Sequence, residues 1–249
     1  MSGHSKWATI KHQKGAKDKA RSKQFAKLIR QVEVAAREGG GDLDGNATLR
    51  TMYAKARGAS VPLDTIERAI KRGTGELEGV RYEAITYEGY GPAGVAMLVE
   101  TLSDNRNRTG ADVRSTFSKG GGSIAEPGAV SWQFERKGVI SLDKILSEDD
   151  VMLVALEAGG DDVIDQGDHW EVRSAPGDVE AVRKALEEAG MTVQQADTMM
   201  VSSNLIPLTD ENDARKVLRL IDTLEENDDV QNVWANFDIS DSVLESVVG

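Results

Sequence analysis

The spacing of apolar residues changes near residue 80, and this change constrains the fold more than any other feature of the sequence. Before it, apolar residues recur at helical intervals, as in the series Phe25, Leu28, Ile29, Val32 and Ala36. After it, short apolar runs typical of strands alternate with further helical stretches. Helices followed by mixed strands and helices indicate an α+β protein with an N-terminal helical bundle.

Three amphipathic helices are predicted in the first part. The first ends at the three glycines of residues 39–41. The second covers Leu49 to Ala56, with Asn46 as a possible N-cap and Gly58 as a C-cap. The third begins at Pro62, which suits a first helical turn, and ends at Gly73.

Beyond residue 80 the pattern predicts strands and helices in two groups. The first group has strands at 82–90, 95–102 and 130–134, with a helix at 111–119. The second group has the order βαββαβ of a ferredoxin-like domain. Its expected strands are 139–142, 162–166, 169–173 and 192–195, and its helices begin after Ser147 and at Val179.

A last helix at 214–224 and a strand at 230–237 cannot bury their apolar faces alone. The group at 80–134 lacks a helix and a strand, so the two pieces are expected to complete each other. Three domains are therefore predicted: a basic arm and helical domain at 1–76, a discontinuous α/β domain at 77–135 with 206–249, and an inserted ferredoxin-like domain at 136–205. Both α/β domains are expected to be ferredoxin-like.

Charge is divided unevenly along the 249 residues. Residues 1–73 contain 16 Lys or Arg and 7 Asp or Glu, a net charge of +9, whereas the remainder has 14 and 35, a net charge of −21. One region should attract polyanions and the other should repel them. A role of the acidic part in solubility alone is the alternative.

The N-terminus is the strongest signal for nucleic-acid binding. Up to Arg21 it forms a cationic arm (residues 1–21) without an apolar stripe, and lysines spread around it suit contacts with phosphates, while Trp7 could stack on a base. An anionic membrane surface, or solubility alone, are alternatives. The predicted contacts in this part are Lys6, Trp7, Lys11, His12, Lys14, Lys17, Lys19, Arg21, Lys23, Lys27 and Arg30.

A second candidate contact lies in the stretch "SDNRNRTGADVR". Arg106 and Arg108 flank Asn107 in an expected strand-to-helix loop, with Arg114 one turn into the helix. Arginine is suited to bidentate contact with phosphate. Ion pairs with Asp104 and Asp112 are an equally good interpretation.

Nothing in the sequence predicts catalysis. There is no Cys, and the three His residues lack metal-ligand spacing, so neither a metal nor a cofactor is expected. No P-loop or Gly-x-Ser-x-Gly motif occurs, and the glycines of "SKGGGSI" follow a helix, as in a connector. An enzyme with a site between the α/β domains is kept as the alternative. No membrane span or secretory signal is predicted, although an organelle transit peptide has some similarity to the basic start.

Four stretches together resemble the YebC/PmpR family over nearly the whole length. They are "MSGHSKWATIKHQKGAKDKARSKQFAKLIRQ", "ATLRTMYAKARGASVPLDTIERAIKRGTGE", "YEGYGPAGVAMLVETLSDNRNRT" and "RSTFSKGGGSIAEPGAVSWQFERKGVI". The resemblance implies three domains, the middle one discontinuous, and a cytoplasmic, non-enzymatic role in gene expression. The family includes bacterial proteins described as transcriptional regulators and the mitochondrial translational activator of cytochrome oxidase.

Two functions remain open within this resemblance. One is regulation of transcription through promoter DNA, and the other is binding to ribosomal RNA and the ribosome to assist translation through proline-rich stretches. A lysine-rich arm without an Arg/Asn/Gln-rich recognition helix favours RNA on physical grounds. No sign of a symmetric dimer reading half-sites is found, so a monomer is expected.

Overall fold

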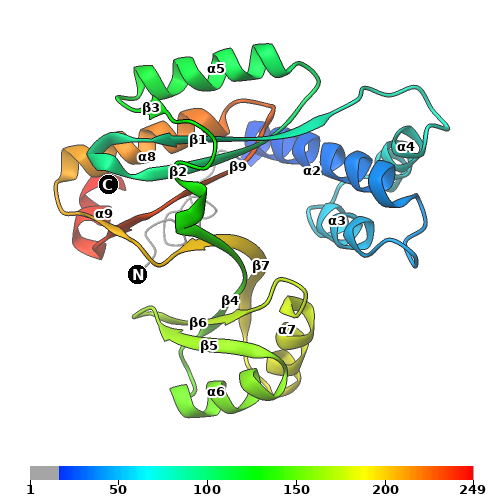
Figure 1. Ribbon diagram of the computed structural model, residues 1–249. Helices are drawn as coiled ribbons and strands as arrows, with labels where there is room; N and C mark the ends of the chain where they lie inside the picture. Colours follow the sequence, from blue (N-terminus) through cyan, green and yellow to red (C-terminus); the bar gives the residue numbers. More distant parts are fainter. Residues whose placement is uncertain (1–16, 249) are drawn as a thin grey trace. The chain divides into compact units, whose positions relative to one another are not determined.

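The computed structural model describes residues 17–248 (Figure 1). Two compact units are formed, one by residues 131–205 and the other by the rest of the described chain. Helices come first and antiparallel sheets follow, so the predicted α+β class with N-terminal helices and two sheet domains is confirmed. The three-domain boundaries stay a prediction.

The N-terminal helices are α2 (Lys17–Gly39), α3 (Ala47–Gly58) and α4 (Leu63–Thr74). Asn46 caps α3 as predicted, since its side chain accepts a hydrogen bond from the backbone N–H of Leu49. Their apolar faces meet in one core, which contains Val32, Ala35, Ala36, Leu49, Ala56, Val61, Ile66 and Ala69.

The prediction that Gly73 ends the third helix is wrong. The helix continues to Thr74 and is capped by Gly75, which adopts the left-handed conformation with φ 85°. Gly73 instead lies buried where α4 crosses α2, and a Cβ atom there would be 2.4 Å from the carbonyl oxygen of Glu33. Glycine is therefore required for close helix packing and not for a turn.

The first sheet has the order β3-β1-β2-β9, and all its pairs are antiparallel. Helices α5 and α8 pack on one face of it (Figure 1), through a core that includes Val99, Phe117, Leu220 and Val233. The elements are β1 (Glu83–Tyr90), β2 (Ala96–Ser103), α5 (Arg106–Lys119), β3 (Ser123–Ile124), α8 (Glu211–Glu225) and β9 (Val230–Ala235).

Strand β9 pairs with β2 in the register Met97 to Ala235, so the late part of the chain completes this sheet as expected. The single strand expected at 230–237 is divided at Asn236, whose side-chain oxygen accepts from the N–H of Ala96 at 2.7 Å. Beyond it, β10 (Phe237–Ile239) pairs in parallel with β8 (Ile206–Leu208). Helix α9 (Asp241–Val248) was not predicted.

The second unit has the order β5-β6-β4-β7 and the sequence βαββαβ, which is the ferredoxin-like arrangement predicted for it. Strand β4 begins at Phe134 and pairs with β7 through Leu142, so it includes the strand expected at 139–142. The strand expected at 130–134 is wrong, because residues 131–133 form a short 3₁₀ helix. Its elements are β4 (Phe134–Asp143), α6 (Glu148–Glu157), β5 (Gly160–Asp165), β6 (His169–Ser174), α7 (Val179–Glu188) and β7 (Val193–Ser202).

Candidate nucleic-acid interface

Three of the predicted contact residues on α2 bind the protein's own backbone. Lys23 Nζ donates to the carbonyl oxygen of Glu226 at 2.7 Å, and Lys27 Nζ donates to that of Glu225 at 3.1 Å. These carbonyls form the C-terminal end of α8, where unpaired oxygens and the helix dipole attract cations. Both ammonium groups therefore stabilise the contact between α2 and α8.

Arg30 continues this row of cations one turn further along α2. Its Nη1 donates to the carbonyl oxygen of Asp228 and to Oδ1 of Asp229, each at 2.8 Å. The guanidinium also lies over the ring of Tyr82, 5.2 Å from the centroid. These contacts join the helical bundle to the start of β9.

Asp229 collects hydrogen bonds from two helices. Its carboxylate accepts from Arg30 on α2, and its Oδ2 accepts from Arg108 Nη2 at 2.7 Å and Thr109 Oγ1 at 2.6 Å on α5. Burial raises the pKa of Asp229, but the hydrogen bonds from Thr109, Arg108 and Arg30 outweigh it, and the net pKa lies below its usual range. The group is therefore held as a buried carboxylate.

Arg106 and Arg108 lie in the first turn of α5, and the prediction that they lie in a loop is wrong. The helix begins early because the side chain of Asn105 caps it, accepting from the N–H of Arg108 at 3.1 Å. Arg108 forms the ion pair with Asp104 that was the alternative interpretation, and a second one with Asp229. Both carboxylates raise the pKa of Arg108, and the hydrogen bond that Arg108 donates to Asp229 is the larger cause.

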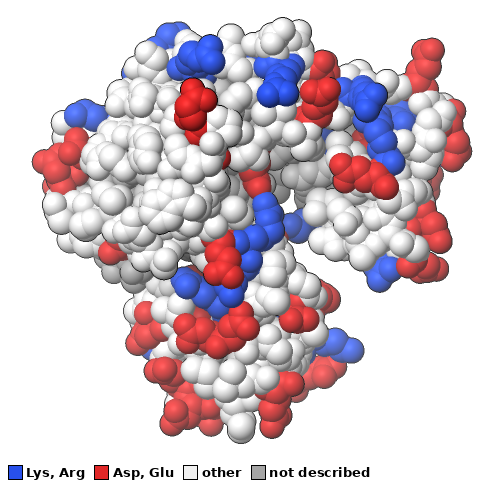
Figure 2. Space-filling view, in the orientation of Figure 1, with Lys and Arg blue, Asp and Glu red and all other residues white. Residues whose placement is uncertain are grey.

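Arg106 and Arg114 are exposed on α5, and neither forms an ion pair with a described residue. Their charges lie near Tyr87, whose hydroxyl group donates to the carbonyl oxygen of Arg106 at 3.4 Å. Figure 2 shows Lys and Arg side chains on the surface over α5, at the top of the view. These two guanidinium groups are available to an external anion.

The other predicted contacts all precede Ser22. Lys17, Lys19 and Arg21 belong to the first turns of α2, and their side chains lie outside the described part of the chain. The remaining ones lie outside the described residues altogether, namely Lys6, Trp7, Lys11, His12 and Lys14.

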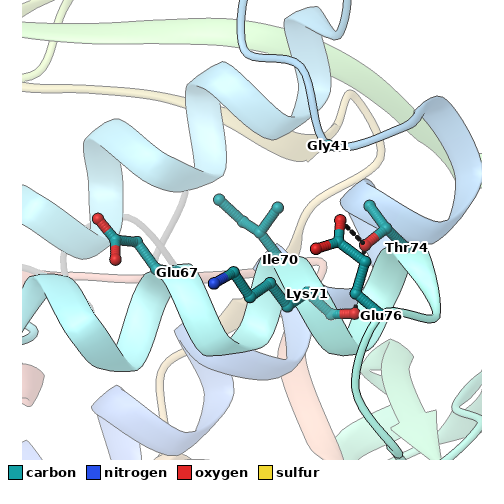
Figure 3. A pocket seen from close by; sticks show the side chains of 6 residues that line it. All are labelled: Gly41, Glu67, Ile70, Lys71, Thr74 and Glu76. Atoms are coloured by element: carbon teal, nitrogen blue, oxygen red, sulfur yellow. Dashed lines mark hydrogen bonds between the residues drawn. The ribbon is translucent and has the colours of Figure 1, made fainter.

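A shallow pocket of about 300 Å³ lies beside α4 (Figure 3). Glu67, Ile70, Lys71 and Thr74 line it, and Thr74 Oγ1 donates to Glu76 Oε1 at 3.1 Å. This hydrogen bond is exposed to solvent, and we assign no reaction to the pocket. No group of residues suited to a metal occurs among residues 17–248, and no helix in that range is long and apolar enough to cross a membrane.

Two family models match the chain, one over its N-terminal helices and one over most of the rest. A family model described as "TACO1/YebC protein N-terminal domain" matches residues 5–76, and one described as "TACO1/YebC second and third domain" matches residues 82–237. The chain belongs to the TACO1/YebC family. The resemblance expected from the sequence is thereby confirmed.

Full-length relatives within the TACO1/YebC family carry similar names. A "Probable transcriptional regulatory protein" of Salinispora arenicola is 55% identical over 98% of both chains, and one of Halothermothrix orenii is 51% identical over 99% of both. A crystal structure of the conserved hypothetical protein Aq1575 from Aquifex aeolicus matches with a TM-score of 0.79 and 43% identity. It covers 92% of this chain and 95% of that one.

The residue at the centre of this site was not predicted. Asp229 stands in the acidic run "EENDD", where its neighbours are exposed or half-buried and only its own carboxylate is buried. Its arginine partners are 121 and 199 residues away in the TACO1/YebC sequence. The acidic run by itself does not indicate which of its carboxylates pairs with two distant arginines.

Proposed function

We propose that this TACO1/YebC protein is a non-enzymatic, cytoplasmic regulator of gene expression that binds nucleic acid through its cationic arm. The observation that carries the proposal is the separation of charge, +9 up to residue 73 and −21 beyond it. Lys23, Lys27 and Arg30 are engaged with α8 and β9, so the main contact is assigned to residues 1–21. That arm contains six Lys or Arg and one acid.

Regulation of transcription through DNA is supported by the names of the relatives. A second candidate, binding to structured RNA during translation, is supported by the surface of α4. This helix follows α3 after a short connection, yet Asp64 and Glu67 lie in its first two turns, where a recognition helix would face the bases. Carboxylates at the start of α4 disfavour insertion of this helix into a DNA groove. The lysines of the arm can bind the phosphates of DNA and of RNA.

Removing residues 1–21 is expected to abolish most of the affinity. If all six cations of the arm neutralise phosphates, the arm should contribute about −5 to the slope of log K against log salt for duplex DNA, and the deletion should remove that contribution. Anisotropy titrations from about 50 to 300 mM KCl against duplex DNA and a stem-loop RNA of equal phosphate number measure both quantities. The polymer with the tighter binding at the higher salt identifies the target class.

A charge-matched pair controls this test. Lys11→Gln/Lys14→Gln/Lys17→Gln should reduce the slope by about 3, while Lys119→Gln/Lys184→Gln/Lys216→Gln, which also removes three charges, should leave it unchanged. Equal slopes in the two triple variants, or unchanged affinity after the deletion, would refute the role of the arm.

Arg106 and Arg114 are expected to add a weaker contact. Arg106→Gln/Arg114→Gln should lower affinity several-fold and reduce the salt slope by about 2. Arg215→Gln/Arg219→Gln, two exposed arginines on α8 without ion pairs to described residues, is the matched control. An equal loss of affinity in both double variants would show that only the net charge of the protein matters, and it would refute a contact at α5.

A further inference from the structure

Helix α6 leaves apolar side chains exposed on its outer face. Val151 and Ala155 are buried against the sheet of the second unit, whereas Leu153 is 64% exposed and Leu156 is 53% exposed. Residues three apart lie on the same side of a helix, so the two leucines form one apolar stripe. A helix that is apolar on opposite sides is normally covered on both.

This exposure is concentrated in one segment. Of the nine large apolar residues that are exposed among the described residues, four lie between positions 145 and 156. Besides the two leucines they are Ile145 and Leu146, which directly precede the N-cap Ser147. Single exposed apolar residues are common, but a cluster on one short helix indicates a binding surface.

The charges around the stripe are of one sign. Helix α6 contains four acidic residues, Glu148, Asp149, Asp150 and Glu157, and no Lys or Arg. None of the four forms an ion pair within the described part of the chain, and residues 131–205 contain 16 acidic and 6 basic residues. Figure 2 shows acidic side chains gathered at the lower end of the view, where α6 lies.

We propose that the outer face of α6 is a docking surface for a basic amphipathic segment of another protein. Apolar side chains of the partner cover Leu153 and Leu156, and its Lys or Arg residues face Asp149 and Glu157, which lie one turn before and after Leu153. A second copy of α6 brings no cation to these carboxylates, and a nucleic acid is repelled by them. The proposal does not depend on the function proposed for the cationic arm.

The test uses the full chain and an 18-residue fluorescent peptide of Leu and Lys with all Leu on one helical face. Leu153→Gln/Leu156→Gln is expected to weaken peptide binding roughly ten- to thirty-fold, because the burial of two leucines is lost. Glutamine is a good helix former, so α6 should remain folded, and an unchanged melting temperature verifies this. Asp149→Asn/Glu157→Gln should weaken binding several-fold, with a smaller effect at high salt.

Leu63→Gln/Leu77→Gln removes two leucines of 43% and 44% exposure outside this unit and should bind the peptide like the wild type. A peptide with Glu in place of Lys should not bind. The proposal would be overturned if the wild type and Leu153→Gln/Leu156→Gln bound the Lys peptide with equal affinity. It would also be overturned if sedimentation velocity showed a concentration-dependent dimer that this double variant abolishes, because a second copy would then be the occupant.

Discussion

Replacing Asp229 by asparagine is expected to lower the free energy of unfolding by about 2–3 kcal/mol at neutral pH. The carboxylate is buried and accepts charge-assisted hydrogen bonds from Arg30 and Arg108 and a third from Thr109. An amide keeps the shape but removes the carboxylate that pairs with Arg30 and leaves Arg108 with Asp104 alone. Hydrogen bonds to charged groups contribute about 1.5–3 kcal/mol. Both arginines retain contact with solvent, so the loss should stay below that of a fully buried pair.

Asp228→Asn provides the matched control, because it makes the same chemical change at the neighbouring, exposed position. It should leave chemical denaturation unchanged. Hydrogen exchange gives a second readout: Asp229→Asn should speed exchange in α2 and at the start of β9, which Asp229 joins. Equal denaturation midpoints for the two variants would refute this role of Asp229.

The Asp229 contribution should also depend on pH. Because the folded pKa lies below the unfolded value of about 3.9, the carboxylate adds stability that is fully present above that pH and is lost as pH falls through the folded pKa. The wild type should therefore lose stability more steeply than Asp229→Asn between about pH 5 and 3. Parallel pH profiles would contradict the assignment.

Replacing Gly73 by valine is expected to cost about 3 kcal/mol or more and to unfold the helical bundle first. A Cβ at this position would lie 2.4 Å from the carbonyl oxygen of Glu33, 2.7 Å from the Cβ of Ala36 and 3.1 Å from the N of Arg37. All three belong to the helix α2 and cannot rotate away, so α4 must move out and expose the core that it shares with α2.

The control for Gly73 is Gly58→Ala at the end of α3, where an added Cβ meets no atom within 4 Å. Its effect should be neutral or stabilising by up to about 1 kcal/mol, since alanine is the better helix former. Far-UV circular dichroism during denaturation should show early loss of helix in Gly73→Val alone. A single cooperative transition with wild-type midpoint would contradict the close contact.

Most of the long helices and strands were predictable because they follow from local periodicity, whereas α9 and the short strands β3, β8 and β10 were not predicted. The three N-terminal helices, the βαββαβ order and the return of the chain to complete the first sheet are confirmed by the structure. The errors lie where distant contacts decide the local outcome. Gly73 is a packing contact and not the predicted end of a helix. The strand predicted at 139–142 begins already at Phe134, because β7 pairs with β4 from Phe134 to Leu142.

The candidate site was predictable in its charge but not in its partners. Arg106, Arg108 and the basic residues of α2 stand out in the sequence, yet only the structure separates the paired cations from the exposed ones. Arg108 faces Asp229, while Arg106, two residues earlier, has no ion pair with a described residue. Residues two apart on a helix point in different directions, so one arginine forms an ion pair with a buried carboxylate while the other remains exposed.

The sequence by itself determined the order of helices and strands, the division of charge at residue 73 and the membership of the TACO1/YebC family. Each of these depends on residue types and their spacing along the chain. The tertiary structure alone decided that Lys23 and Lys27 bind the end of α8, that Asp229 joins α2 to α5, and that Leu153 and Leu156 remain exposed. Such contacts depend on which distant segments meet when the apolar faces are buried, and periodicity carries no information about them.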